Sequence, residues 1–172
     1  MRRAAKAVNF GIIYGIGAFS LSKDIDVSVA EADRYIKSYL ANYPNVAKYM
    51  DKTVKDAMGN GYVSTMFGRR RYIPELSASN KMLQAFGKRA AMNAPIQGSA
   101  ADIIKIAMIK VYQKLKAEKL DARLILQVHD ELIVEASEEC AERAAVMLND
   151  EMEHAAKLSV PLIADVNKGR SW

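Results

Sequence analysis

The sequence contains a single cysteine, Cys140, and only two histidines. One cysteine excludes any disulfide within the chain, and its helical surroundings favour a small buried residue over a nucleophile. The chain also lacks the cluster of cysteines and histidines that a zinc site needs. No apolar run approaches the roughly 20 residues of a membrane-spanning helix. The basic start of the chain has features of a targeting peptide, but Lys6 and Asn9 interrupt its apolar run, so we expect a cytosolic protein.

Acidic residues are absent from some stretches and concentrated in others. The first 23 residues contain four cations and no acid, and residues 66–90 contain six cations against Glu75 alone. Residues 130–154 hold nine acids and one arginine, Arg143. With a net charge of +5, this distribution favours a surface that faces phosphates and a separate acidic face. The 172 residues suffice for one domain with a sizeable core or for two small lobes.

The start of the chain predicts a helix with two different faces. Two cations and two aromatic residues recur at intervals of four: Arg2, Lys6, Phe10 and Tyr14. At about 100° per residue they form one row. The row can hold a phosphate chain at its cationic end and a base at its aromatic end, or it is simply a solvated basic face. The opposite face suits burial and consists of Ala4, Ala5, Val8, Gly11 and Ile12.

Capping and turn residues predict the next elements. Ser28 and Glu31 form a capping box at the start of a helix that ends before Pro44, and Pro44 can open the following helix. We expect a hairpin over residues 62–73, and a helix capped by Ser79. Further expectations are a helix break at Pro95, a second helix over about 97–118, two strands around His129-Asp130-Glu131, a helix from Ser137 to about Leu158, and a last strand over 161–166.

Three polar groups after residue 68 are candidates for chemistry. A basic run, Arg69-Arg70-Arg71, stands beside Tyr72, although most such runs are solvated turns. A second group, spaced by four residues, consists of Arg89, Asn93 and Gln97. These side chains can direct hydrogen-bond donors into one groove of a duplex, or they only cap the helices around Pro95. The third group is His129-Asp130-Glu131, at a predicted turn between two apolar strands. An aspartate in this position can hold Mg²⁺, or the three residues form an ordinary polar turn.

Four strings resemble the motifs of the family A DNA polymerases, in family order and over essentially the whole chain. They are R-x3-K-x3-F-x3-Y-G from Arg2, G-R-R-R-Y-I-P from Gly68, N-A-P-I-Q-G-S-A-A-D from Asn93, and Q-V-H-D-E from Gln127. Phe10 is the residue type of the bacterial members. The resemblance implies an α+β fold. It implies a helical fingers lobe over residues 1–78, which the chain enters partway, and the C-terminal part of the palm over 79–172, where a short antiparallel sheet packs on long helices.

The resemblance also implies roles for single residues in a DNA polymerase that transfers nucleotides to a primer end. Arg2, Lys6, Phe10 and Tyr14 would bind the deoxynucleoside triphosphate, with Lys6 also protonating the pyrophosphate. Gly15 and Gly17 would be hinge residues for closure of the fingers. The implied catalytic carboxylates are Asp130, which also binds metal, and Glu131, with two Mg²⁺ ions in the intact enzyme. The implied contacts to primer–template DNA are Arg69, Arg70, Arg89, Asn93, Gln97 and His129.

One family motif has no counterpart in this chain. The strand that carries the other metal-binding aspartate, a D-Y-S-x-I-E-like string, does not occur. Because two-metal phosphoryl transfer needs carboxylates on both sides of the ion pair, we expect the chain to be inactive without the N-terminal part of the same polymerase. Two other classes remain open. One is a non-catalytic nucleic-acid-binding module, and the other is a protein that lies on a membrane surface through its basic first helix.

Overall fold

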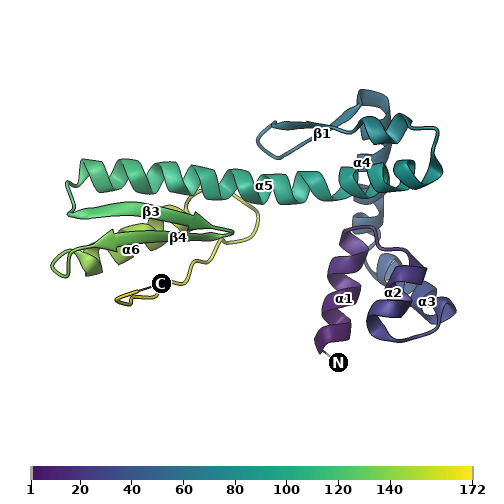
Figure 1. Cartoon of the computed structure of the whole chain (residues 1–172), viewed down its shortest axis with the longest axis horizontal. Coiled ribbons are helices and arrows are strands. Elements are labelled where there is room, and N and C mark those ends of the chain that lie inside the picture. The colour runs from purple at the N-terminus through teal and green to yellow at the C-terminus, as the bar shows by residue number, and fades with distance from the viewer. Residues whose placement is uncertain (1, 172) are drawn as a thin grey trace. The chain divides into compact units, whose positions relative to one another are not determined.

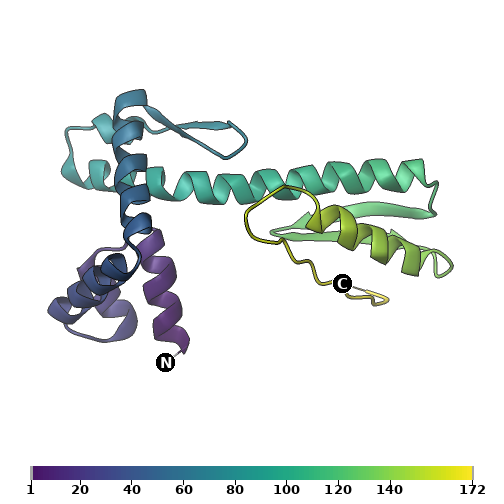
Figure 2. The same ribbon diagram turned by 180° about the vertical axis from the view of Figure 1, so that it is seen from behind.

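The computed structural model describes residues 2–171, with side chains from Ala5 onward. It forms two compact units, one up to Gly98 and one from Ser99, and the long helix α5 runs from the first into the second (Figures 1 and 2). The predicted α+β class is confirmed. The elements are α1 (Arg2–Ile13), α2 (Ala18–Ile25), α3 (Val29–Asn42), α4 (Pro44–Asn60), β1 (Tyr62–Ser64), β2 (Arg70–Tyr72), the 3₁₀ helix η1 (Pro74–Ser77), α5 (Lys81–Ala117), β3 (Ala122–Val128), β4 (Glu131–Ala136) and α6 (Ala141–Glu153).

Local signals determine where the helices of the first unit begin and end. The Ser28 hydroxyl accepts a hydrogen bond from the Glu31 amide at 3.2 Å, as a helix cap should. Pro44 occupies the first turn of α4, where its missing N–H has no helical acceptor to lose. Gly61 ends α4 in the left-handed conformation, with φ of 78°, and the chain turns into the predicted hairpin of β1 and β2. These predictions are confirmed.

The core of the first unit joins α4, the hairpin, η1 and the first half of α5. Its buried members are Ala57, Val63, Ile73, Leu76, Ala91 and Ala94. Gly87 of α5 lies directly against η1. A Cβ at Gly87 would stand 2.9 Å from the Leu76 amide nitrogen and 3.0 Å from the Glu75 carbonyl carbon. Only glycine therefore permits this approach of helix to backbone.

The expected helix break at Pro95 is wrong, because α5 continues through Pro95 as one helix of 37 residues. A proline inside a helix removes one backbone hydrogen bond. Here α5 buries apolar side chains on both sides of the proline, Ala91 and Ala94 before it and Val111 after it, and this packing outweighs the local cost. The cap also differs from the expected Ser79, since the Asn80 side chain accepts the amides of Met82 at 2.8 Å and Leu83 at 3.3 Å.

In the second unit, the antiparallel pair β3 and β4 lies alongside the C-terminal half of α5, and α6 packs on β4 (Figures 1 and 2). One core cluster joins these elements, with Ala107, Val111 and Leu115 from α5, Leu132 from β4, and Met147 from α6. The register shifts by one residue between Leu124 and Leu126, so the alternation of side chains along β3 changes there.

Two expectations for the C-terminal part are wrong. Helix α6 starts at Ala141, with Cys140 rather than Ser137 at its cap position, because residues 138–140 form a turn in which the Cys140 amide donates to the Ser137 carbonyl. It ends at Glu153 rather than at about Leu158. Residues 161–166 are not a strand, because they pair with neither β3 nor β4. Side chains of α6 hold this segment instead. The Asn149 amide donates to the Ala164 carbonyl at 2.6 Å, and the Ala164 N–H donates to Glu153 at 3.1 Å.

Over residues 2–171, no helix is both long enough and apolar enough to cross a membrane.

Candidate nucleotide and DNA site

Helix α1 and the turn directly after it carry the row of a cation and two rings on an exposed face. The Lys6 ammonium nitrogen lies 6.0 Å from the centroid of the Phe10 ring, and the Phe10 and Tyr14 centroids lie 6.3 Å apart. Phe10 is 51% and Tyr14 37% exposed, whereas Ile12 on the other face is 2% exposed. Three side chains therefore form one continuous cation–ring–ring surface.

Some of the expected side chains of α1 lie elsewhere or outside the described residues. Ala5 was expected to be buried and is exposed, whereas Ile12, farther along the helix, is buried in the packing of α1 with other elements of the first unit. Val8 and Gly11 are half-buried, as expected of the inner face. The side chains of Arg2 and Ala4 lie outside the described part of the structure.

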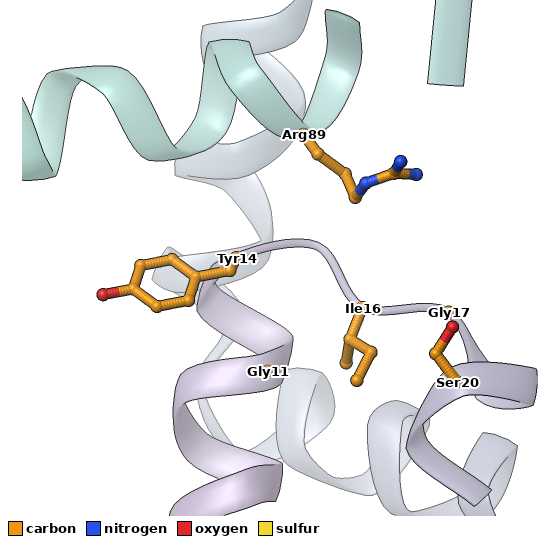
Figure 3. A pocket seen from close by; sticks show the side chains of 6 residues that line it. All are labelled: Gly11, Tyr14, Ile16, Gly17, Ser20 and Arg89. Atoms are coloured by element: carbon orange, nitrogen blue, oxygen red, sulfur yellow. The ribbon is translucent and has the colours of Figure 1, made fainter. Parts of the chain in front are cut away.

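A shallow pocket of about 430 Å³ lies at the end of this row (Figure 3). Tyr14 and Arg89 flank it, one from the end of α1 and the other from α5. Two residues that sequence reasoning assigned to different motifs thus line one cavity. The remaining lining residues are Gly11, Ile16, Gly17 and Ser20. Ile16 and Ser20 were missed, and neither stands in a pattern from which their position could have been inferred.

Gly15, directly after the row of Lys6, Phe10 and Tyr14, packs against helix α5. It adopts φ of 74°, which favours glycine, and a Cβ there would lie 2.3 Å from the Met92 methyl carbon and 3.3 Å from Arg89 Cγ. The connection from α1 to α2 therefore packs closely on the segment of α5 that carries Arg89.

Arg89, Asn93 and Gln97 share one face of α5, because the helix is continuous and the residues are four apart. Arg89 and Gln97 are exposed, and Asn93 is half-buried. The Asn93 side-chain oxygen is buried and accepts no hydrogen bond from the described residues. An acceptor buried in this way is costly unless a ligand or water supplies a donor. The face thus offers a guanidinium and two amides in one line.

The basic hairpin holds its arginines in different surroundings. The Arg69 guanidinium donates to the Gly98 carbonyl at 3.0 Å. Arg70 stacks on Tyr62, with 4.6 Å from its central carbon to the ring centroid, and the Tyr62 and Tyr72 rings meet edge to face at 5.6 Å. Both arginines of the hairpin that were predicted to bind DNA, Arg69 and Arg70, therefore make contacts within the chain.

The turn between β3 and β4 presents the predicted carboxylates to solvent. His129 has φ of 53°, which is uncommon for a residue with a side chain. The side-chain amide of Gln127 donates to the His129 carbonyl at 2.7 Å. Asp130 is exposed in the turn, and Glu131 is the exposed first residue of β4. No group of three or more potential metal ligands occurs among residues 2–171. Two neighbouring carboxylates suit Mg²⁺ in kind but provide only part of a site.

A family model described as DNA polymerase family A matches residues 1–172. The chain belongs to DNA polymerase family A. Among the family's members, the DNA polymerase I of Bacillus subtilis is 52% identical over all 172 residues, and that of Caldicellulosiruptor bescii is 51% identical over the same length. The chain spans about a fifth of the length of these relatives.

The fold of this DNA polymerase family A chain matches a solved structure as well. The POL domain of Pol1 from M. smegmatis, in complex with a DNA primer-template and dNTP, superposes with a TM-score of 0.95. The identity is 44%, and the match covers 99% of this chain and 30% of that one. The family inferred from the four motifs is therefore confirmed.

Proposed function

We propose that this chain is the nucleotide-binding and DNA-binding portion of a DNA-directed DNA polymerase. The observation that carries the proposal is the exposed row of Lys6, Phe10 and Tyr14, in a chain that the family matches from end to end. The reaction is the transfer of a nucleotide from a deoxynucleoside triphosphate to a primer 3′-hydroxyl. In domain terms, we propose that residues 1–78 belong to the fingers and 79–172 to the palm.

In this proposal, α1 binds the incoming nucleotide. Lys6 and Arg2 neutralise the triphosphate, because a cation beside a phosphate oxygen forms a charge-assisted hydrogen bond. Lys6 also carries the proton that the pyrophosphate takes up on leaving. Phe10 packs against the sugar and base, and Tyr14 lies at the pocket beside Arg89, where it borders the templating position. The exposure of both rings supports these roles, since an aromatic face stacks on a base only when the protein does not cover it.

DNA is held by the row on α5, by the basic hairpin and by His129. Arg89, Asn93 and Gln97 present donors from one helix face, which suits the acceptors on the floor of the minor groove. The primer end lies against His129, next to the carboxylates in the same turn.

Asp130 and Glu131 are the proposed catalytic carboxylates, with Asp130 a ligand for Mg²⁺. Bound Mg²⁺ would supply positive charge for the attacking and leaving oxygens. The exposure of both carboxylates at a tight turn supports the assignment, because a substrate can approach them without displacing other side chains. Two carboxylates do not complete a site with two ions, so the proposal includes a partner, the N-terminal part of the same polymerase, that supplies the remaining carboxylate.

A non-catalytic nucleic-acid-binding module is the second candidate. It is favoured by the cationic surfaces, which suffice for binding, whereas no three potential metal ligands cluster among residues 2–171. It differs from the first proposal in predicting that no added polymerase segment produces synthesis.

Both candidates predict salt-dependent DNA binding, which fluorescence anisotropy with a labelled primer–template measures. If the five cations at 69–71 and 88–89 all contact phosphates, log K should fall with log salt with a slope of roughly −4 to −5. A slope near zero would contradict DNA binding by these surfaces.

A further inference from the structure

We propose that Arg69 is a positioning residue, which anchors the turn of the basic hairpin on α5 and does not itself contact phosphate. The inference rests on the proposed DNA binding and changes the role of one residue within it. All the residues involved lie in the first unit.

The turn between β1 and β2 is closed around one threonine. The Thr65 hydroxyl accepts the amides of Phe67 at 3.3 Å and Arg69 at 3.2 Å. The Thr65 amide donates to the Arg69 carbonyl at 2.9 Å, and the Gly68 amide donates to the Thr65 carbonyl at 3.0 Å. Gly68 adopts φ of 82°, which lets the chain reverse without strain. These hydrogen bonds therefore hold the backbone of Arg69 in place independently of its side chain.

The side chain of Arg69 then joins this turn to helix α5. Its guanidinium donates to the Gly98 carbonyl at 3.0 Å. A Cβ at Gly98 would lie 2.6 Å from the Thr65 methyl carbon and 3.4 Å from the terminal nitrogen of Arg69. A side chain at Gly98 would have to displace the Thr65 methyl group, so the turn rests directly on the helix at this glycine. Gly98 follows Gln97, so the anchor lies one residue from the proposed groove-reading face.

The chemistry of the guanidinium explains why an arginine occupies this position. Its donors are fixed in a planar fork, so a nitrogen bonded to a carbonyl also fixes the orientation of the rest of the group. The neighbouring arginines differ. Arg70 stacks on Tyr62, and the side chain of Arg71, unlike its backbone in β2, makes no hydrogen bond or ion pair with the residues that the structure describes. Arg71 therefore keeps its full set of donors for a phosphate, and the anchor at Arg69 holds the hairpin that presents it.

The test measures DNA affinity against salt for the wild-type chain and four variants. Gly98→Ala inserts a methyl group at the anchor and leaves every charge in place, and Arg69→Met removes the donors. We expect each to weaken binding about 2- to 10-fold at fixed salt, the range of one hydrogen bond, with the salt slope essentially unchanged. Arg69→Lys, which can still donate to the Gly98 carbonyl, should recover part of the loss.

Arg71→Met is the matched control, with the same change of charge in the same hairpin. It should reduce the magnitude of the slope by about 0.9, as expected for one lost phosphate contact. With Arg69 excluded from the phosphate contacts, four cations remain, and the wild-type slope should be about −3.6.

The possible outcomes separate the two proposals. A flat salt response of the wild-type chain would contradict the proposed DNA binding. A normal wild-type slope that Arg69→Met reduces as much as Arg71→Met does would make Arg69 a phosphate contact and overturn this inference. Wild-type affinity in both Arg69→Met and Gly98→Ala would also overturn it, because the anchor would then serve only the fold. If Gly98→Ala does not fold, the two Arg69 variants decide the question.

Discussion

At the scale of single residues, Gly87 is a position where the fold tolerates little change. A methyl group there would meet the backbone of η1 at 2.9–3.0 Å, and backbone cannot move aside as a flexible side chain can. We expect Gly87→Ala to lower the free energy of unfolding by about 1–3 kcal/mol, the range for overpacking a core. Chemical denaturation followed by circular dichroism measures the change.

Gly59→Ala is the control for the effect of alanine on a helix. Gly59 lies inside α4, and a Cβ there would meet no atom within 4 Å. Alanine should therefore raise the free energy of unfolding by up to about 1 kcal/mol, because it removes flexibility from the unfolded chain. Equal effects at both positions would show that the contact of Gly87 with η1 does not limit the substitution.

Sequence reasoning succeeds for residues whose relation depends only on helix geometry. Lys6, Phe10 and Tyr14 were expected to form one row, and the ring distances agree. It does not find contacts between residues distant in the chain. Nothing in the basic run indicates that Arg69 bonds the carbonyl of Gly98, because that contact depends on how a hairpin packs on a helix.

At the scale of elements, burial overrides local signals. Pro95 was expected to end a helix, and α5 continues because its flanking turns are packed into two cores. Residues 161–166 have the composition of a strand but pair with no strand, and the side chains of Asn149 and Glu153 bond the backbone of Ala164 instead. In both segments the local signal gave the wrong result, because packing and strand pairing determined the final structure.

The sheet of the second unit should cause the chain to self-associate. Within residues 2–171, β3 and β4 pair only with each other, and Leu126 of β3 is 48% exposed. Unpaired strand edges with apolar side chains pair readily with other chains. We expect light scattering to show dimers or larger species as the concentration approaches the millimolar range.

Leu126→Lys should reduce this association, because a charged side chain on a strand disfavours pairing between sheets. The control is Val160→Lys, which adds the same charge at an apolar residue that is 63% exposed and lies outside the strands. A clean monomer of the wild-type chain at millimolar concentration would contradict the prediction, and so would equal effects of the two lysines.

At the scale of the whole molecule, the proposed function gives this chain only part of a catalytic apparatus. The sequence identified the family, the α+β class and the residues on α1, since these depend on motifs and periodicity. The sequence has no D-Y-S-x-I-E-like string, and the exposed Asp130 and Glu131, the proposed catalytic carboxylates, have no third potential ligand nearby among the described residues. The account therefore predicts binding without turnover for the chain alone.

Primer extension with Mg²⁺ and all four deoxynucleoside triphosphates tests this central claim most directly. The chain would be assayed alone, with the part of the Bacillus subtilis relative that precedes the matched region, and with that same part when the chain carries Asp130→Ala. We predict no extension, measurable extension and no extension, in that order, because Asp130 supplies one side of a site with two metal ions. Robust synthesis by the chain alone, or synthesis that survives Asp130→Ala in the combined sample, would contradict the account.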